Sequence, residues 1–285
     1  VCSSDLESNA RGVEPPCPHV ARGCGGCDLQ HATPDLQAEI KVGIVRESLT
    51  RLARVAEPEL VAASQPASPP FGYRTTLRLA VDERGRVGFR RRRRHEVVAI
   101  DHCPIAHPAI GERLGSWRVE PGVDEVIVRA SASEGVVGVW AEPDSHSLSG
   151  IDAIRGVDAR LVERVGDRDF AVSMGSFFQP SPQAAEALVG AVDRSLGPVD
   201  LRPPGDTVDA FGGIGLLGAS VVPADRRVSL VEVNPWAVAD ARVNLAGRDA
   251  AFAESSVEEW SPTSDRKSTR LNSSHEWISR MPSSA

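Results

Sequence analysis

The sequence is short of several features, and each shortage excludes a class of protein. Only five of its 285 residues are cysteine, and a chain of this length can bury a core of its own without disulfides. It has no run of about eighteen apolar residues that could span a membrane. The net charge of −7 argues against a uniformly basic nucleic-acid binder. We expect a cytoplasmic, monomeric protein with no membrane partner and two domains, or one domain and part of another.

Three of the five cysteines stand within eleven residues, at C-x6-C-G-G-C spacing. They are Cys17, Cys24 and Cys27, and Cys103 follows 76 positions later in Asp-His-Cys-Pro. Thiolates are the soft ligands of iron-sulfur clusters and structural zinc. The two glycines after Cys24 let the backbone turn tightly, so that neighbouring sulfurs can face one centre. We predict a metal site made of these four cysteines. Spacing alone does not separate zinc from iron-sulfur, and disulfides or free thiols are the alternative.

Periodicity divides the rest of the chain into an α+β part and an α/β part. Residues 7–60 hold the cysteine segment and one helix from Asp35 to Ala53, whose apolar stripe we expect in the core. Residues 61–178 read as a central antiparallel β domain that contributes Cys103. Residues 179–262 alternate strand and helix, as at the start of a doubly wound, Rossmann-like sheet of about three strands.

The two ends of the chain differ in amino-acid composition from the residues between them. Residues 1–6 and 263–285 are rich in serine and show no helix or strand period. They resemble translated sequencing-adapter tails, so we expect both ends to be foreign and the gene to be cut short. An ordinary disordered tail is the alternative.

Positive charge is concentrated in one stretch although the whole chain is acidic. Nine arginines lie between Arg74 and Arg94, against Asp82 and Glu83. A local patch of this kind can bind phosphates, whereas the alternative is a solvated surface. Few aromatic residues are interleaved, which leaves base stacking unsupported. The residues that we predict to contact RNA are Arg74, Arg90, Arg91, Arg92, Arg93 and Arg94.

A glycine-rich turn follows the first strand of the α/β part, in Asp209-x-Phe211-Gly-Gly213-x-Gly215. Glycines let the backbone approach a ligand at the carboxyl end of a strand, where α/β folds bind ligands. Glu232 ends the next strand, 21 residues after Phe211, and is placed to accept hydrogen bonds from ribose hydroxyls. The spacing is neither G-x-G-x-x-G nor that of a phosphate loop. A turn that only serves packing is the alternative.

The acid-and-glycine pattern resembles motif I of class I S-adenosylmethionine-dependent methyltransferases. Together with the four cysteines, the Tyr73-Arg-Thr-Thr-Leu-Arg strand and Ser176-Phe-Phe-Gln179, it resembles the RNA uracil-C5 methyltransferases that carry a 4Fe-4S cluster, over roughly Pro16 to Glu259. The resemblance implies the four cysteines as cluster ligands and an RNA substrate, ribosomal (23S) rather than transfer RNA. It implies S-adenosylmethionine as cofactor, at the site residues Gln179, Phe211, Gly213, Gly215 and Glu232.

The chain departs from this family in ways that bear on activity. Leu216 stands where members often have Asn, and the small β-barrel module with which many members begin is not seen. Members activate uracil by adding a thiolate to C6, and a glutamate base later removes the C5 proton. No cysteine follows Cys103, so we expect an inactive fragment of the parent enzyme. Two alternatives stay open: a metal-stabilised RNA-binding protein without methyltransferase activity, and a zinc-bound methyltransferase acting on something other than RNA.

Overall fold

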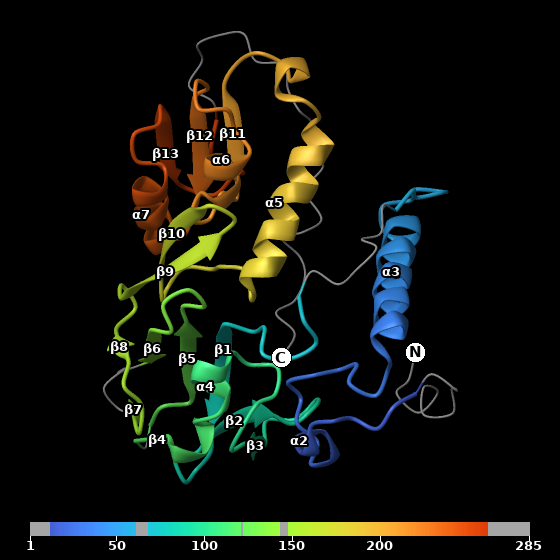
Figure 1. Ribbon diagram of the computed structural model, residues 1–285, viewed down its shortest axis with the longest axis vertical. Helices are drawn as coiled ribbons and strands as arrows, with labels where there is room; N and C mark the ends of the chain where they lie inside the picture. Colours follow the sequence, from blue (N-terminus) through green and yellow to red (C-terminus); the bar gives the residue numbers. More distant parts are fainter. Residues whose placement is uncertain (1–11, 61–67, 121, 143–147, 262–285) are drawn as a thin grey trace. The chain divides into compact units, whose positions relative to one another are not determined.

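The computed structural model describes residues 12–60, 68–120, 122–142 and 148–261. The expected foreign ends, 1–6 and 263–285, lie outside these ranges. The chain forms two compact units, drawn in Figure 1. The first unit runs to Gly156 and includes Pro180–Ala184, and the second consists of Val157–Gln179 and the chain from Ala185 onward. Within the described ranges, no helix has the length and apolarity needed to cross a membrane.

The first unit is built on a six-stranded sheet in the order β3-β2-β1-β5-β6-β8. All neighbours pair antiparallel except β6 and β8, which are parallel. Strand β1 alternates as its sequence predicts, because Leu77 and Leu79 are fully buried while Arg78 between them is exposed. The strands are β1 (Thr76–Val81), β2 (Val87–Arg90), β3 (Val97–Ala99), β5 (Glu125–Ala130), β6 (Val137–Glu142) and β8 (Ile154–Arg155).

Smaller elements surround this sheet. Strands β4 (Arg118–Val119) and β7 (Leu148–Ser149) pair antiparallel in a sheet of their own. The short helices are α2 (Pro18–Ala21), α4 (Pro108–Gly111) and the 3-10 turn Leu114–Ser116. The loops between β3 and α4 carry Cys103 into the hydrophobic core of this unit.

Helix α3 (Pro34–Arg51) forms where the period predicts it, but its apolar stripe is not core. Thr33 caps the helix by accepting a hydrogen bond from the Leu36 N–H. Leu36 is its only buried residue, whereas Ile44 is 57% and Val45 49% exposed. The expectation of a buried stripe is therefore wrong. Periodicity identifies an apolar face, but it does not supply an element to cover that face.

The second unit joins a hairpin to a parallel sheet. Strands β9 (Arg160–Val165) and β10 (Arg168–Ser173) form the hairpin. The sheet has the order β11-β12-β13 with parallel pairing throughout, which is the predicted α/β alternation of three strands. From α5 onward the elements are α5 (Pro182–Leu196), a 3-10 turn (Val199–Leu201), β11 (Thr207–Ala210), α6 (Leu216–Ser220), β12 (Val228–Glu232), α7 (Pro235–Asn244) and β13 (Ala250–Glu254). The first three residues of α5 belong to the first unit.

The hairpin β9–β10 belongs to the second unit, not to the antiparallel domain over 61–178 in which the sequence analysis placed it. Phe170 and Val172 pack in the same core as Leu230 and Ala241. Antiparallel pairing is local and can be predicted from alternation, whereas the core that a hairpin joins depends on distant residues. The chain consequently leaves the first unit at Gly156, and only Pro180–Ala184 returns to it.

Candidate functional site

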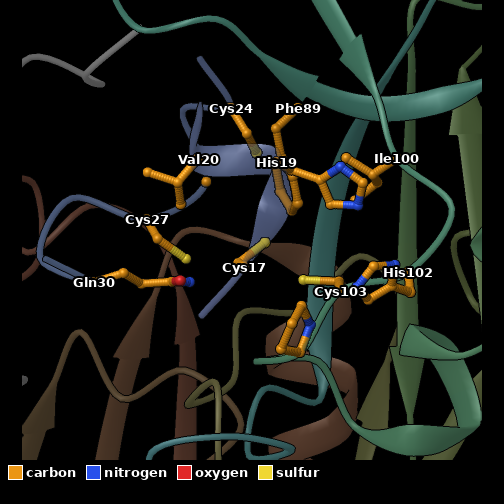
Figure 2. Close-up of a pocket in the computed structure, with 12 residues that line it drawn as sticks. Cys17, His19, Val20, Cys24, Cys27, Gln30, Phe89, Ile100, His102 and Cys103 are labelled. Carbon is orange, nitrogen blue, oxygen red and sulfur yellow. The ribbon is translucent and has the colours of Figure 1, made fainter. Parts of the chain in front are cut away.

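The four cysteines that the sequence singles out line one pocket of the first unit. Cys17 precedes α2, Cys24 and Cys27 flank two glycines, and Cys103 follows β3. Figure 2 shows the sulfurs of Cys17, Cys27 and Cys103 pointing toward a common space. All four are free thiols, so the structure has no disulfide among them. We call this set of four the cysteine pocket.

The double glycine is required by the close approach of the chain that carries β2. A Cβ on Gly25 would lie 2.5 Å from the Arg90 carbonyl oxygen, and one on Gly26 would lie 3.0 Å from the Phe89 ring. The Gly25 N–H donates to the Arg90 carbonyl at 3.0 Å, and Cys24 forms an isolated antiparallel bridge with Arg91. The end of β2 is therefore one wall of the cysteine pocket.

Burial makes this pocket costly for unpaired thiolates. It raises the pKa of Cys103 to about 11, and desolvation likewise raises the pKa of Cys24 and Cys27. The remaining walls include the apolar side chains of Val20, Phe89 and Ile100. Four soft donors in an apolar setting fit a cationic centre that keeps them deprotonated, either zinc or an iron-sulfur cluster.

Two histidines and an aspartate beside the cysteine pocket were not anticipated. Asp101 carboxylate oxygen Oδ1 lies 3.0 Å from His19 Nε2 and 2.9 Å from His102 Nδ1. Burial lowers the pKa of His19, whose exposed fraction is 3%, and the hydrogen bond from His102 lowers the pKa of Asp101. The available signal was adjacency, since His19 stands two residues after Cys17 and His102 directly before Cys103.

The five consecutive arginines, residues 90–94, form the connection between β2 and β3, which we call the arginine loop. Arg91 pairs with Glu96 at 3.1 Å, and Arg92 pairs with Asp28 at 3.1 Å and donates to the Cys27 carbonyl at 2.8 Å. Arg93 and Arg94 are exposed, and among the described residues their side chains have no partner.

The other two predicted arginines are held by backbone carbonyls. Arg90 reaches the His95 carbonyl at 3.4 Å, and Arg74, just before β1, donates to the Thr76 carbonyl at 3.1 Å. The backbone of the arginine loop contacts Cys24 and Gly25, so the loop adjoins the segment that supplies two of the pocket cysteines.

In the second unit, the turn from Phe211 to Gly215 connects β11 to α6, and we call it the Gly-rich turn. Gly213 and Gly215 adopt positive φ values of 53° and 82°, which favour glycine. Phe211 adopts φ 58° and is 53% exposed, a conformation that costs energy for a bulky residue and is typical of ligand sites. The Gly-rich turn is therefore a candidate ligand site.

Glu232 faces this turn from the end of β12. Its Oε2 accepts a hydrogen bond from the Gly213 N–H at 3.0 Å, and its Oε1 accepts one from the Asn234 N–H at 2.9 Å. Asp209 Oδ2 accepts from the Gly218 N–H at 2.9 Å and so fixes α6. Burial raises the pKa of Asp209, and the nearby Glu232 adds to that shift. Glu232 therefore binds the turn itself, and Asp209 binds the helix that follows it.

Gln179 is the one predicted cofactor residue that no hydrogen bond of the described structure joins to this group. It is half-buried in the segment between β10 and α5, within the second unit. Among the described residues, no hydrogen bond connects its side chain to the Gly-rich turn. Phe211, Gly213, Gly215 and Glu232 are brought together by the structure, whereas Gln179 lies on a neighbouring segment.

Comparison with known proteins gives homologues but no family model, since none matches the chain. An uncharacterized RNA methyltransferase of Streptomyces coelicolor is 33% identical over 87% of this chain and 60% of its own length. The 23S rRNA (uracil(1939)-C(5))-methyltransferase RlmD of Pectobacterium atrosepticum is 29% identical over 80% of this chain and 58% of its own length. The chain thus spans about three fifths of the curated relatives that it matches.

A solved structure has the same fold. The tRNA (uracil-54, C5)-methyltransferase of Pyrococcus abyssi, in complex with S-adenosyl-L-homocysteine, matches with a TM-score of 0.60 at 24% identity, over 84% of this chain and 67% of that one. Its fold is mixed α/β, as the sequence analysis expects. The relatives to which the chain is similar are named RNA methyltransferases, and some of them are named 23S rRNA uracil-C5 methyltransferases.

Proposed function

We propose that this chain is part of an S-adenosylmethionine-dependent RNA uracil-C5 methyltransferase that acts on 23S rRNA. The observation that carries the proposal is the Glu232 carboxylate, which bridges the Gly213 and Asn234 N–H groups beside the strained Phe211. A carboxylate at the carboxyl end of the second parallel strand is suited to the two hydroxyls of an adenosyl ribose. The cofactor, when bound, supplies the methyl group.

The cysteine pocket supports a 4Fe-4S cluster better than zinc. Four thiolates on one zinc ion stand about 3.8 Å apart, given Zn–S bonds of about 2.3 Å in a tetrahedron. Among the described residues, the one group of three or more donors within 4.8 Å of one another is His19, Asp101 and His102, and the sulfurs form no such group. Wider spacing suits a cluster, where each thiolate binds a different iron. Cys17, Cys24, Cys27 and Cys103 would hold it, and the cluster would tie the N-terminal loop to the β3–α4 loop.

The arginine loop is the part of the first unit that we assign to RNA. Arg93 and Arg94 are the exposed members without a side-chain partner in the described structure, so they can neutralise phosphates without breaking an ion pair. Arg74, Arg90, Arg91 and Arg92 are already engaged, and we assign them to shaping the loop. Ribosomal RNA is favoured over transfer RNA because relatives across this length are named for 23S rRNA.

The residues present bind and orient but do not complete the reaction. Attack on uracil needs a thiolate nucleophile at C6 and a base for the C5 proton. The four described cysteines all line the pocket assigned to the cluster, and no cysteine follows Cys103. We therefore expect this chain to bind S-adenosylmethionine and RNA without transferring a methyl group.

Equilibrium dialysis of this chain with labelled S-adenosylmethionine tests the proposal. We expect saturable binding that Glu232→Gln weakens about tenfold, because the amide cannot accept from two N–H groups and two ribose hydroxyls at once. Glu186→Gln, an exposed glutamate on α5, is the matched control and should bind like the parent. An absence of binding, together with retained binding of RNA, would instead favour a metal-stabilised RNA-binding protein.

A further inference from the structure

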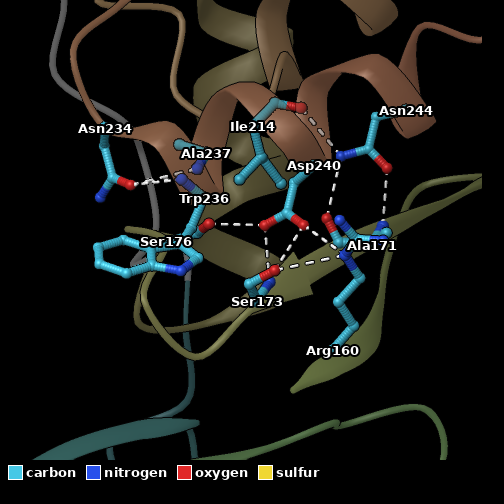
Figure 3. Close-up of polar contacts among 10 residues, drawn as sticks. All are labelled: Arg160, Ala171, Ser173, Ser176, Ile214, Asn234, Trp236, Ala237, Asp240 and Asn244. Carbon is cyan, nitrogen blue, oxygen red and sulfur yellow. Dashed lines mark hydrogen bonds and ion pairs between the residues drawn. The ribbon is translucent and has the colours of Figure 1, made fainter. Parts of the chain in front are cut away.

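Asp240, in α7, is fully buried and accepts four hydrogen bonds. Figure 3 shows its carboxylate among the donors of the β9–β10 hairpin and the segment that follows it. They are the Ser173 N–H at 2.7 Å, the Ser173 hydroxyl at 2.6 Å, the Ser176 hydroxyl at 2.6 Å and Arg160 Nε at 2.9 Å. A buried charge is costly to desolvate, and apolar residues often stabilise a core equally well. Stability alone therefore does not explain why a carboxylate occupies this position.

Asn244, one helical turn later, joins the same hairpin to the Gly-rich turn. Its Oδ1 accepts from the Ala171 N–H at 2.7 Å, and its Nδ2 donates to the Ala171 carbonyl at 3.0 Å. The same Nδ2 donates to the carbonyl of Ile214 at 2.9 Å. Ile214 lies between the two glycines of positive φ, so a movement of the hairpin is transmitted to the Gly-rich turn.

Asn234, at the start of α7, ties the segment after β10 to Glu232. Its Nδ2 donates to the Gly175 carbonyl at 2.9 Å, while its backbone N–H donates to Glu232. Gly175 lies so close to α7 that a Cβ would be 2.8 Å from the Trp236 ring. The segment that leads to Gln179 is thus pinned beside the Glu232 carboxylate.

We infer that Asn234, Asp240 and Asn244, which we call the α7 clamp, position the cofactor-binding parts of the second unit, with Asp240 as the principal positioning residue. The clamp holds the Ser176–Gln179 segment, the Gly-rich turn and Glu232 in one arrangement before the adenosyl ligand arrives. This inference rests on the proposed function, because it assigns that ligand to this unit. Preorganisation of this kind raises affinity by reducing the ordering that binding requires.

Four directional donors on one carboxylate specify an arrangement more narrowly than apolar packing does. Asp240→Asn replaces one acceptor oxygen by an amide that donates, so at least one of the Ser173 and Ser176 donors loses its partner. The hairpin core, including Phe170 and Val172, is untouched by this change. The substitution therefore loosens the orientation of the segment while its apolar packing persists.

Calorimetric titration of the whole chain with S-adenosylhomocysteine tests the inference. We expect Asp240→Asn to weaken binding about tenfold, the effect of one lost hydrogen bond to a charged group. Val238→Ala, which removes buried methyl groups from the same helix, is the control for lost stability. It should bind like the parent at a temperature at which both variants are folded. Equal binding by Asp240→Asn and the parent would overturn the inference.

A ligand-independent measurement separates this inference from the proposed function. Hydrogen exchange of the amides in residues 173–179 and 211–215 should become faster together in Asp240→Asn, and in neither segment in Val238→Ala. If Asp240→Asn does not fold, Ser176→Ala removes a single donor and should show the same joint change at smaller size. A parent chain that binds no S-adenosylhomocysteine refutes the proposed function. Faster exchange confined to 173–179, with binding unchanged, refutes the clamp alone.

Discussion

The backbone N–H of Gly25 donates to the carbonyl oxygen of Arg90 at 3.0 Å, which joins the cysteine loop to the arginine loop. The contact is so close that a side chain at position 25 has no space. The proposed metal site and the proposed RNA-binding loop are therefore joined through their backbones. A metal centre that fixes the cysteine loop would also fix Arg90, the first residue of the arginine loop.

The first prediction concerns Gly25→Ala. The added Cβ would meet the Arg90 carbonyl at 2.5 Å, and because that atom is backbone, one of the two loops must shift. We expect the bound metal per chain to fall severalfold and the unfolding free energy to fall by about 1–3 kcal/mol, as for other overpacked sites.

Gly43→Ala is the matched control for this change. Gly43 lies in α3, and apart from the nearby backbone of the helix itself no described atom would lie within 4 Å of an added Cβ. Alanine should therefore stabilise the helix by about 1 kcal/mol and leave metal content unchanged. Chemical denaturation and elemental analysis of both variants compare the two outcomes. Equal metal content in Gly25→Ala and the parent would contradict the account of this loop.

The second prediction concerns the arginine loop. Replacing Arg93 and Arg94 by alanine removes two exposed guanidinium groups and disturbs no ion pair of the described structure. We expect weaker binding to a 23S rRNA fragment and a shallower dependence of log K on log salt, by up to about 1 for each lost phosphate contact. Filter binding over a range of salt concentrations measures both.

The control for that experiment is Arg51→Ala on α3, where the arginine pairs with Glu47 at 2.7 Å. It changes the net charge in the same direction as each loop substitution but lies outside the loop. A salt dependence that is the same for all variants would show that the arginine loop does not contact phosphates.

The third prediction concerns Asp209, whose pKa burial raises above its ordinary value. An acid with a raised folded-state pKa contributes stability below its unfolded pKa and loses it as pH rises through the folded value. Asp209→Asn keeps an oxygen acceptor for the Gly218 N–H and removes the buried charge. Relative to the parent, this variant should therefore gain stability as pH rises from about 4 toward neutrality.

Denaturation at several pH values tests this prediction. The difference in unfolding free energy between Asp209→Asn and the parent should grow in favour of the variant over that interval. Asp206→Asn, at an exposed aspartate just before β11, should show no such trend. A difference that shrinks with rising pH would mean that the ionised Asp209 stabilises the turn.

Local patterns in the sequence predicted much of this molecule. Cysteine spacing predicted the pocket in which Cys103 meets the other three, because ligand residues are recognisable by type. The glycines after Asp209 and the acid at Glu232 predicted the turn and its facing carboxylate, because strand, turn and helix follow one another along the chain. In each case the residues that predicted the site lie within a few tens of positions of one another, except Cys103, which is distant in the sequence.

Features that depend on distant surfaces could not be predicted in the same way. The apolar face of α3 has the period of a buried helix, but burial depends on a partner that no period encodes. The hairpin β9–β10 was assigned to the wrong unit because its pairing is local and its core is not. Asp101 and Asp240 were missed because a single aspartate in a sequence does not reveal which donors fold around it.

We propose above all that Cys17, Cys24, Cys27 and Cys103 hold one iron-sulfur cluster. Iron and acid-labile sulfide analysis of the anaerobically purified chain tests it most directly, alongside Cys103→Ser. We predict about four iron and four sulfide per chain in the parent and a large loss of both in the variant. A colourless parent with one zinc per chain, or a variant that keeps its full iron content, would contradict the claim.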